Sequence, residues 1–185
     1  MPLELLSEDT LLLIIDYQHR LAAAMPAEVL KIHAANVARL AKGAAVLDLP
    51  IIVTEQYPRG LGDTLDVVLE ALPEGTVRHP KTQFSVWRDP NIRAAIEATG
   101  RRQVVMVGME THVCVYQSAR DLVAAGYEVC CPQDALVSRA KGNWRGGLRL
   151  LTEVGATVTV TEAVLFDLIK EGRGEAFKAI SRLVR

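Results

Sequence analysis

The sequence predicts an α/β fold: a three-layer, Rossmann-like, six-stranded parallel sheet with helices on both faces. Short apolar segments alternate along the chain with longer segments whose apolar residues have helical spacing. The short segments are almost continuously apolar, which is typical of strands covered on both faces. The chain has 185 residues and no long linker, low-complexity segment or internal repeat. This predicts a single domain over residues 1–185.

Six segments are expected to form the strands. The clearest are residues 10–15 and 103–107, two mainly apolar runs that end at an aspartate and a glycine. The least apolar is residues 76–79. The remaining three are residues 50–54, 127–131 and 156–160. With right-handed crossovers, six such strands suggest the order 3-2-1-4-5-6, in which strands 1 and 4 meet at the switch point.

The segments between the strands are expected to be helices and two loops. Residues 26–49 have the apolar spacing of a long amphipathic helix. Asp89 and Pro90 are typical of a helix start, and Gly100 is typical of its end, which predicts a helix over residues 90–99. Further helices are expected over residues 64–72, 115–125, 138–154, 161–169 and 175–183, and loops over residues 55–62 and 80–85.

Composition excludes several classes of partner and cofactor. The net charge is −1 and there is no basic run, so no nucleic-acid partner is expected. No apolar stretch reaches the ~18 residues that span a bilayer, so no membrane association is expected. The first strand is followed by Asp16 without a glycine-rich turn, so no dinucleotide cofactor is expected. The acidic N-terminus does not resemble a signal peptide, and three cysteines, two of them adjacent, favour reduced thiols and a cytoplasmic location.

Three residues with complementary chemistry follow predicted strands. Asp16 follows strand 1, Lys81 follows strand 3, and Cys114 lies at the start of the helix after strand 4. Ligands of open parallel sheets bind at the carboxyl ends of the strands. A thiol that attacks a carbonyl needs a base, for which Asp16 is suited, and a nearby cation such as Lys81. Because a helix start favours anions, we expect the pKa of the Cys114 thiol to be lowered.

Each of these residues also has a structural interpretation. A buried cysteine commonly packs in a core, a strand-end aspartate commonly caps a turn, and a loop lysine is commonly solvated. Their shared position at strand ends favours a catalytic set. Cys130 and Cys131 have no such partners and are expected to be core or near-surface thiols. His112 is interpreted equally well as a pocket residue or a surface residue, and the other histidines, His19, His33 and His79, lack metal-ligand spacing.

Three motifs carry a resemblance to a known family. They are the sequences LIIDYQ at residues 13–18, HPKTQFS at residues 79–85 and GMETHVCV at residues 108–115. Together they resemble the isochorismatase-like cysteine hydrolases, which include nicotinamidases and N-carbamoylsarcosine amidases. The resemblance implies a catalytic triad and a non-proline cis peptide before the threonine, here Met109–Glu110. The implied triad is Asp16, Lys81 and Cys114.

An oxyanion hole is expected from backbone N–H groups at the helix entry, those of Glu110 or Thr111 and of Cys114. The loop over residues 54–62 resembles the subgroup described as isochorismatase domain-containing proteins. Nicotinamidases carry a metal site after strand 2, but this chain has Glu55 and Gln56 there. No metal, cofactor or nicotinamide substrate is therefore expected.

The main functional hypothesis is a cofactor-independent hydrolase of a small amide, carbamoyl or related C–N substrate, acting through a Cys114 thioester. The residues expected to line its pocket are Tyr17, Gln18, Glu55, Phe84, Trp87 and Thr111. Core packing is an equally good interpretation for Tyr17, Gln18, Phe84, Trp87 and Thr111. Alternatives are a non-catalytic binding or scaffold protein, an isochorismatase-type ether hydrolase and, last, a redox-sensing thiol. The resemblance also implies a homodimer or homotetramer, with residues 165–184 packing on a neighbour or covering the chain's own sheet.

Overall fold

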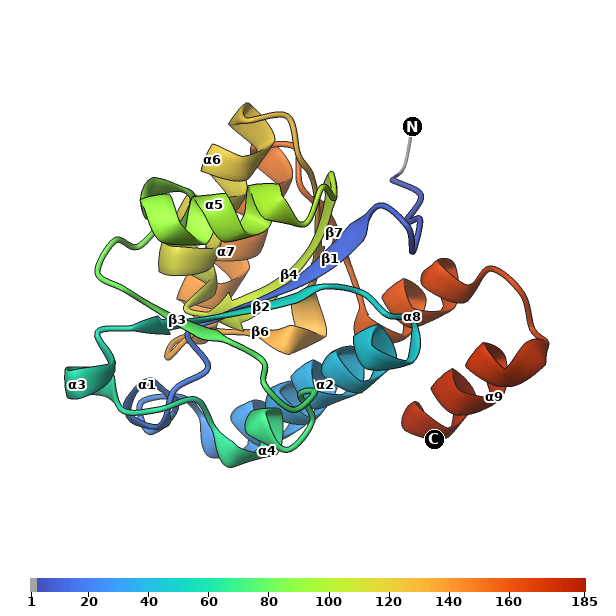
Figure 1. The fold of residues 1–185 in the computed structure, drawn as a ribbon. Helices are drawn as coiled ribbons and strands as arrows, with labels where there is room; N and C mark the ends of the chain where they lie inside the picture. The colour runs from blue at the N-terminus through green and yellow to red at the C-terminus, as the bar shows by residue number, and fades with distance from the viewer. Residues whose placement is uncertain (1–2) are drawn as a thin grey trace.

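The computed structural model describes residues 3–185 and has a parallel sheet between two layers of helices (Figure 1). The main path of the sheet is β3-β2-β1-β4-β5-β7, with every pair of neighbours parallel. This confirms the predicted fold class and the predicted order for six strands. The strands are β1 (Thr10–Ile15), β2 (Ile51–Gln56), β3 (Arg78–Lys81), β4 (Gln103–Met109), β5 (Glu128–Pro132), β6 (Leu136–Val137) and β7 (Thr157–Thr159).

A seventh strand, β6, was not predicted. It has two residues, which pair with Gly108 and Met109 at the carboxyl end of β4. The pairing of β5 with β4 ends earlier, at Val105. β6 therefore takes over as the neighbour of β4 near the end of the strand. A two-residue strand has no alternation or length by which a sequence pattern could identify it.

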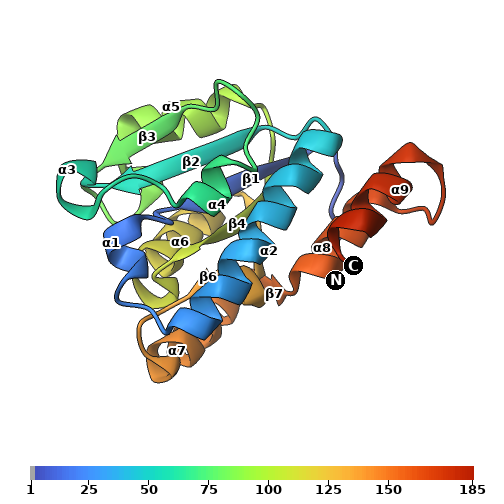
Figure 2. The ribbon, with the colours of Figure 1, turned by 90° about the horizontal axis from the view of Figure 1, so that it is seen from below.

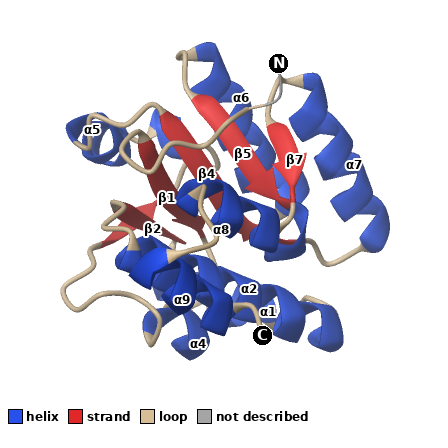
Figure 3. Ribbon diagram, turned by 90° about the vertical axis from the view of Figure 1, so that its right-hand side faces the viewer, coloured by secondary structure: helices blue, strands red, loops and turns tan. Residues whose placement is uncertain are grey.

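Helices cover both faces of the sheet (Figure 3). One face carries α2, α8 and α9, and the other carries α5, α6 and α7 (Figures 1 and 2). The helices are α1 (His19–Ala22), α2 (Ala27–Val46), α3 (Pro58–Leu61), α4 (Asp66–Leu69), α5 (Pro90–Ala98), α6 (Tyr116–Ala124), α7 (Lys141–Glu153), α8 (Thr161–Ile169) and α9 (Gly174–Leu183). Within residues 3–185, no helix combines the length and the apolar character needed to cross a membrane.

Strand β1 shows why its sequence is apolar throughout. All six of its residues are buried. Leu12 and Ile14 belong to the core beneath α2, whereas Leu13 and Ile15 belong to the core beneath α5 and α6. Successive strand residues point to opposite faces, so a strand with helices on both sides needs apolar residues at every position.

The last two helices pack within the chain, α9 against α2 and α8. Leu165 of α8 and Ile180 of α9 are fully buried in the same core as α2. Gly43 of α2 permits this packing, because a Cβ there would lie 2.4 Å from a methyl carbon of Leu165. Residues 165–184 thus pack within the chain, and packing of this segment on a neighbouring copy stays a prediction.

Several element boundaries near the carboxyl ends of the strands differ from the predicted ones. β2 and β4 each end two residues later than predicted, and the segment expected to be a loop over residues 55–62 begins inside β2 and contains the short helix α3. β3 ends at Lys81, so this lysine is the last strand residue rather than part of a loop. The segment after β4 begins as a π-helical turn, Thr111–Val115, before α6. α7 begins at Lys141, three residues later than expected. A π-helical turn differs from an α-helix in hydrogen-bond spacing, which apolar periodicity does not reveal.

Candidate active site

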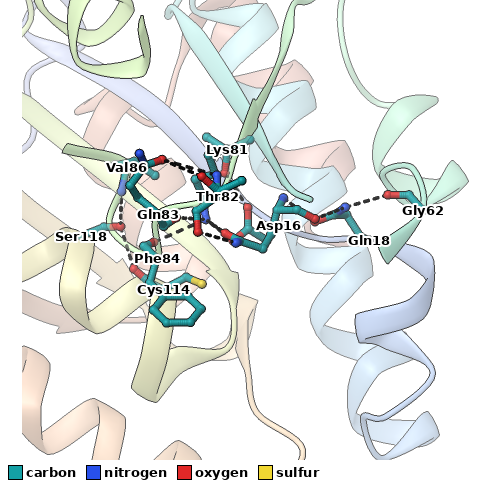
Figure 4. A network of polar contacts seen from close by, with 12 residues as sticks. Asp16, Gln18, Gly62, Lys81, Thr82, Gln83, Phe84, Val86, Cys114 and Ser118 are labelled. Atoms are coloured by element: carbon teal, nitrogen blue, oxygen red, sulfur yellow. Dashed lines mark hydrogen bonds and ion pairs between the residues drawn. The ribbon is translucent and has the colours of Figure 1, made fainter. Parts of the chain in front are cut away.

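The structure brings Asp16, Lys81 and Cys114 together at the carboxyl edge of the sheet (Figure 4). Asp16 directly follows β1, Lys81 ends β3, and Cys114 lies in the π-helical turn after β4. All three residues are buried, with exposed fractions of 0%, 3% and 6%. The Lys81 Nζ and Asp16 Oδ2 atoms are 2.6 Å apart. Residues far apart in the sequence thus form one polar cluster in the interior.

Asp16 is fixed by contacts from the neighbouring strand. Its Oδ1 accepts a hydrogen bond from Thr54 Oγ1 at 2.8 Å, and its backbone N–H donates to the Thr54 carbonyl at 3.1 Å. Its φ angle is +54°, a left-handed conformation that aspartate tolerates better than most residues. Such conformations persist where the surrounding contacts determine them, and they are found often at functional sites.

Lys81 is surrounded by oxygen acceptors. Besides Asp16 Oδ2, its Nζ lies 2.7 Å from Gln56 Oε1, 3.2 Å from the Gln83 carbonyl and 3.4 Å from the Phe84 carbonyl. An ammonium group has three protons to donate, so these contacts engage all of them. Lys81 is therefore positioned to act on the site through its charge, and not to donate a proton to a ligand.

Gln56 is a site residue that the sequence interpretation did not identify. Its Oε1 binds Lys81 Nζ, and its Nε2 donates to the Thr82 carbonyl at 2.8 Å. Gln56 is the last residue of β2, and its neighbour across the sheet is Lys81. A polar residue at the end of a central strand, next to a strand that ends in lysine, was the available signal.

The backbone of Cys114 is anchored to the segment that follows Lys81. The Ser118 hydroxyl donates a hydrogen bond to the Cys114 carbonyl at 2.6 Å. The same Ser118 Oγ accepts a hydrogen bond from the backbone N–H of Val86 at 3.1 Å. Ser118 and Val86 are both buried. The hydroxyl of Ser118 therefore couples the π-helical turn to the loop after β3, and so helps to fix the nucleophile candidate relative to the ion pair.

The pKa of the Cys114 thiol is raised from 9.0 to about 12. Burial is the largest cause; the negative charge of Asp16 and its hydrogen bond also raise the pKa, while Lys81 opposes them. The predicted lowering of this pKa is therefore wrong. A helix start favours a thiolate, but here removal from water and a nearby carboxylate outweigh that effect. The resting thiol is protonated beside a carboxylate that can accept its proton.

Three of the residues expected to line the pocket have structural contacts instead. The Tyr17 hydroxyl donates to the Ala135 carbonyl at 3.2 Å, and the ring lies in the α2 core. The Gln18 amide bridges the backbones of Gln56 and Gly62. Glu55 Oε1 accepts hydrogen bonds from the backbone and hydroxyl of Thr64, at 2.9 and 2.7 Å, and lies 3.6 Å from the Arg78 guanidinium. The polar atoms of Gln18 and Glu55 thus hold the loop that follows β2, whereas the Tyr17 hydroxyl bonds the segment between β5 and β6.

The other three candidates differ in exposure. The Trp87 ring packs edge-on against Tyr127, with ring centroids 5.3 Å apart. Tyr127 directly precedes β5, so this contact lies toward the amino edge of the sheet, away from the candidate site at the carboxyl edge. Phe84 has 52% of its surface exposed. Thr111 is fully buried, and its hydroxyl has no hydrogen-bond partner among the described residues. A buried hydroxyl without a partner is uncommon.

The turn before Cys114 has a distinctive backbone. The peptide between Met109 and Glu110 is cis. The Glu110 carbonyl accepts hydrogen bonds from the backbone N–H groups of Val113 and Val115. Arg139 holds the Glu110 side chain. The Arg139 backbone N–H donates to Glu110 Oε2 at 2.9 Å, and the Arg139 guanidinium lies 3.0 Å from Glu110 Oε1. The turn is thus fixed at both ends.

The place where nicotinamidases carry a metal site does not offer a metal a set of ligands. Glu55 Oε1 is bound to Thr64, and Gln56 Oε1 is bound to Lys81. Throughout residues 3–185, no three His, Cys, Asp or Glu side chains gather in a way that could hold a metal ion. The remaining thiols, Cys130 and Cys131, are buried in β5.

Comparisons with known proteins place the chain in a family. The family model of the Isochorismatase domain matches residues 10–163. Isochorismatase domain-containing protein 1 of Danio rerio is 38% identical over 148 residues, which are 80% of this chain and 51% of that protein. The chain thus spans about half the length of this relative. Isochorismatase domain-containing protein 2 of Danio rerio is 35% identical over 150 residues, which are 80% of this chain and 74% of that protein.

Solved structures share the fold. The MAR1 ribonuclease from Caenorhabditis elegans superposes with a TM-score of 0.92 at 30% identity, over 98% of this chain and 92% of that one. The YcaC gene product of Escherichia coli, described as an octameric hydrolase of unknown specificity, gives a TM-score of 0.89 at 21% identity, over 97% and 88% of the two chains. A pyrazinamidase/nicotinamidase from Streptococcus mutans gives a TM-score of 0.70 at 19% identity, over 80% of this chain and 99% of that one. At these lower identities the likeness concerns the fold alone. With the family match over residues 10–163 and the identity to the curated relatives, the chain belongs to the isochorismatase-like hydrolase family.

Proposed function

We propose that this protein is a cysteine hydrolase that cleaves a small amide, carbamoyl or related C–N substrate through a thioester on Cys114. The observation that carries the proposal is the buried pair of Lys81 and Asp16, 2.6 Å apart, beside a buried thiol. A buried ion pair is costly unless other interactions compensate it. Such pairs, when they perturb a nearby nucleophile, are typical of reaction sites.

In the first half-reaction the Cys114 sulfur attacks the substrate carbonyl carbon as its proton passes to Asp16. A C–S bond forms, and the carbonyl electrons move to the oxygen. When the tetrahedral intermediate collapses, the C–N bond breaks and Asp16 returns the proton to the leaving nitrogen. The result is a thioester and a free amine or ammonia.

In the second half-reaction a water molecule gives a proton to Asp16 and attacks the thioester carbonyl. The C–S bond then breaks, the proton returns to sulfur, and the acid product leaves. Lys81 keeps Asp16 in position and favours the thiolate through its charge, since it lowers the pKa of the thiol. The proton thus moves through a single carboxylate in both steps.

The developing oxyanion needs hydrogen-bond donors, and the first turn of a helix provides N–H groups without intrahelical partners. In this proposal the N–H groups of Glu110 or Thr111 and of Cys114 fill this role. The Thr111 hydroxyl, which has no hydrogen-bond partner within residues 3–185, and the exposed ring of Phe84 are proposed to contact the substrate. Because Cys114 is only 6% exposed, a small reacting group is favoured over a bulky one.

A second candidate is a non-catalytic binding or scaffold protein with the same fold. The raised pKa of the Cys114 thiol favours it, because the resting group is not the reactive thiolate. An isochorismatase-type ether hydrolase is a further alternative, because it need not use the cysteine.

We also propose that the chain forms a homo-oligomer, an idea supported by the octameric assembly named for YcaC. We further propose that it resides in the cytoplasm, where its free thiols stay reduced.

The proposal is tested by assaying a panel of small amides, carbamoyl compounds and a vinyl ether. The variants are Cys114→Ala, Asp16→Asn and the matched control Cys130→Ala, which removes a buried thiol outside the cluster. We expect C–N cleavage by the wild type and the control, and a loss of roughly 10³-fold or more in both site variants. Turnover that survives Cys114→Ala would refute the thioester, and cleavage of the ether alone would favour the alternative reaction.

A further inference from the structure

A cavity of about 270 Å³ is lined by residues near the starts of α2 and α7 and at the end of β6. Its volume approaches the lower end of small-molecule sites. It opens next to the end of β6, and so at the same carboxyl edge of the sheet as the triad. Its lining includes Val29 and His33 of α2, Val137 and Ser138 at the end of β6, and Lys141 and Trp144 of α7.

Two aromatic side chains build a fixed wall of this cavity. His33 Nδ1 lies 2.7 Å from the Leu136 carbonyl, and Trp144 Nε1 donates to the same carbonyl at 3.0 Å. The first ring comes from α2 and the second from α7, so one oxygen joins both helices. Burial lowers the pKa of His33, which keeps the ring neutral. A neutral ring that donates from Nδ1 leaves Nε2 as an acceptor.

The chemistry of the lining selects a class of ligand. Val29, Val137 and the Trp144 ring provide apolar surface for a compact ring. Lys141 provides a cation in the first turn of α7, where the helix dipole also favours a negative group. We propose that this cavity binds a small aromatic or alicyclic carboxylic acid, with its ring against Trp144 and Val137 and its carboxylate at Lys141.

The cavity is connected to the π-helical turn but is separate from the nucleophile. Ser138, which lines it, has its Oγ 3.1 Å from His112 Nδ1. His112 lies two residues before Cys114. Binding in the cavity requires neither the Cys114 thiol nor turnover, so the proposal stands or falls independently of the proposed hydrolysis.

The test uses the fluorescence of Trp144 in a Trp87→Phe background, which leaves Trp144 as the sole tryptophan. Benzoate and cyclohexanecarboxylate are the probes, and benzyl alcohol and cyclohexylmethanol are their neutral counterparts. We expect a saturable change with the acids and at least roughly tenfold weaker binding of the alcohols, the factor that corresponds to 1.4 kcal/mol. The same binding is expected when Cys114→Ala is added.

Two matched pairs of variants locate the site. Lys141→Met should weaken benzoate binding at least tenfold, whereas Lys31→Met, an exposed lysine of α2 outside the lining, should not change it. Val29→Glu should weaken it similarly, whereas Ile32→Glu, at another exposed apolar position of α2, should not. The proposal is overturned if neither acid gives a saturable change, if the alcohols bind as well as the acids, or if Lys141→Met binds benzoate as tightly as Lys31→Met.

Discussion

Replacing Asp16 with asparagine should separate the reactivity of the Cys114 thiol from turnover. The pKa of this thiol is raised from 9.0 to about 12, and the Asp16 charge and hydrogen bond are among the causes. At 1.36 kcal/mol per pKa unit, this amounts to about 4 kcal/mol in favour of the protonated thiol. At pH 8 a pKa of about 12 leaves about one molecule in 10⁴ as thiolate.

Asp16→Asn removes the negative charge but keeps the shape of the side chain. Burial still raises the thiol pKa and Lys81 still lowers it, so the pKa should fall by about one unit or more, in the range for a neighbouring charge. Turnover should be lost, because the proton acceptor is gone. The change leaves the Lys81 ammonium buried without its partner, at a cost of about 3–5 kcal/mol, so circular dichroism must first show that the variant is folded.

The assay follows thiolate absorbance at 240 nm from pH 6 to pH 11. Each protein is compared with its own Cys114→Ser derivative, which cancels the signal of Cys130 and Cys131. The wild type should show no ionisation of Cys114 below about pH 10, and the Asp16→Asn protein should ionise at lower pH. A step in the wild type at or below pH 8, or a rise of the pKa on Asp16→Asn, would refute the reasoning.

Three further predictions concern packing, the lysine site and alkaline stability. Gly147→Ala places a Cβ 2.9 Å from a backbone nitrogen of the π-helical turn, so it should destabilise the protein by about 1–3 kcal/mol. Gly146→Ala, with open space at the Cβ, should instead stabilise it by about 0.5–1 kcal/mol, and equal effects in urea unfolding would contradict this packing. Gln56→Leu removes an acceptor 2.7 Å from the buried Lys81 ammonium and should lower the unfolding free energy by about 1.5–3 kcal/mol. The control Gln83→Leu, at an exposed position, should lower it by less than about 0.5 kcal/mol, and similar urea midpoints for the two variants would argue against this contact. Burial raises the pKa of Cys130 from 9.0 to about 12, so above pH 9 this thiol ionises in the unfolded chain but not in the folded chain, and stability falls as pH rises. Cys130→Ala should make this decline shallower by about 1.4 kcal/mol per pH unit, and parallel plots of unfolding free energy against pH would show that the thiol is not the cause.

The order of the strands and the place of the candidate site were predictable from the sequence. Asp16 and Cys114 follow strands 1 and 4, which the parallel topology makes neighbours, and β1 and β4 pair along their whole common length. Lys81 was placed at the correct edge of the sheet, although β3 is shifted by two residues from the predicted strand. These features depend on apolar patterning and on chain connectivity, both of which the sequence contains.

The detailed contacts of the site were not predictable in the same way. The hydrogen bonds of Gln18 and Gln56 depend on how the loop after β2 folds back, and residue types alone do not determine that path. The direction of the Cys114 pKa shift depends on its depth of burial relative to the benefit of a helix start. Trp87 and Tyr17 were interpreted equally well as pocket or core residues, and their rings pack against Tyr127 and in the α2 core.

The central claim is that Cys114 carries a covalent intermediate, and mass spectrometry of the quenched enzyme tests it most directly. The wild type and the Cys130→Ala control are mixed with substrates of the small-amide and carbamoyl panel, quenched in acid at short times and digested. We expect an acyl or carbamoyl mass increase on the peptide that contains Cys114, which disappears as product forms. Turnover of a panel substrate without this adduct, or an adduct that persists in Cys114→Ala, would contradict it.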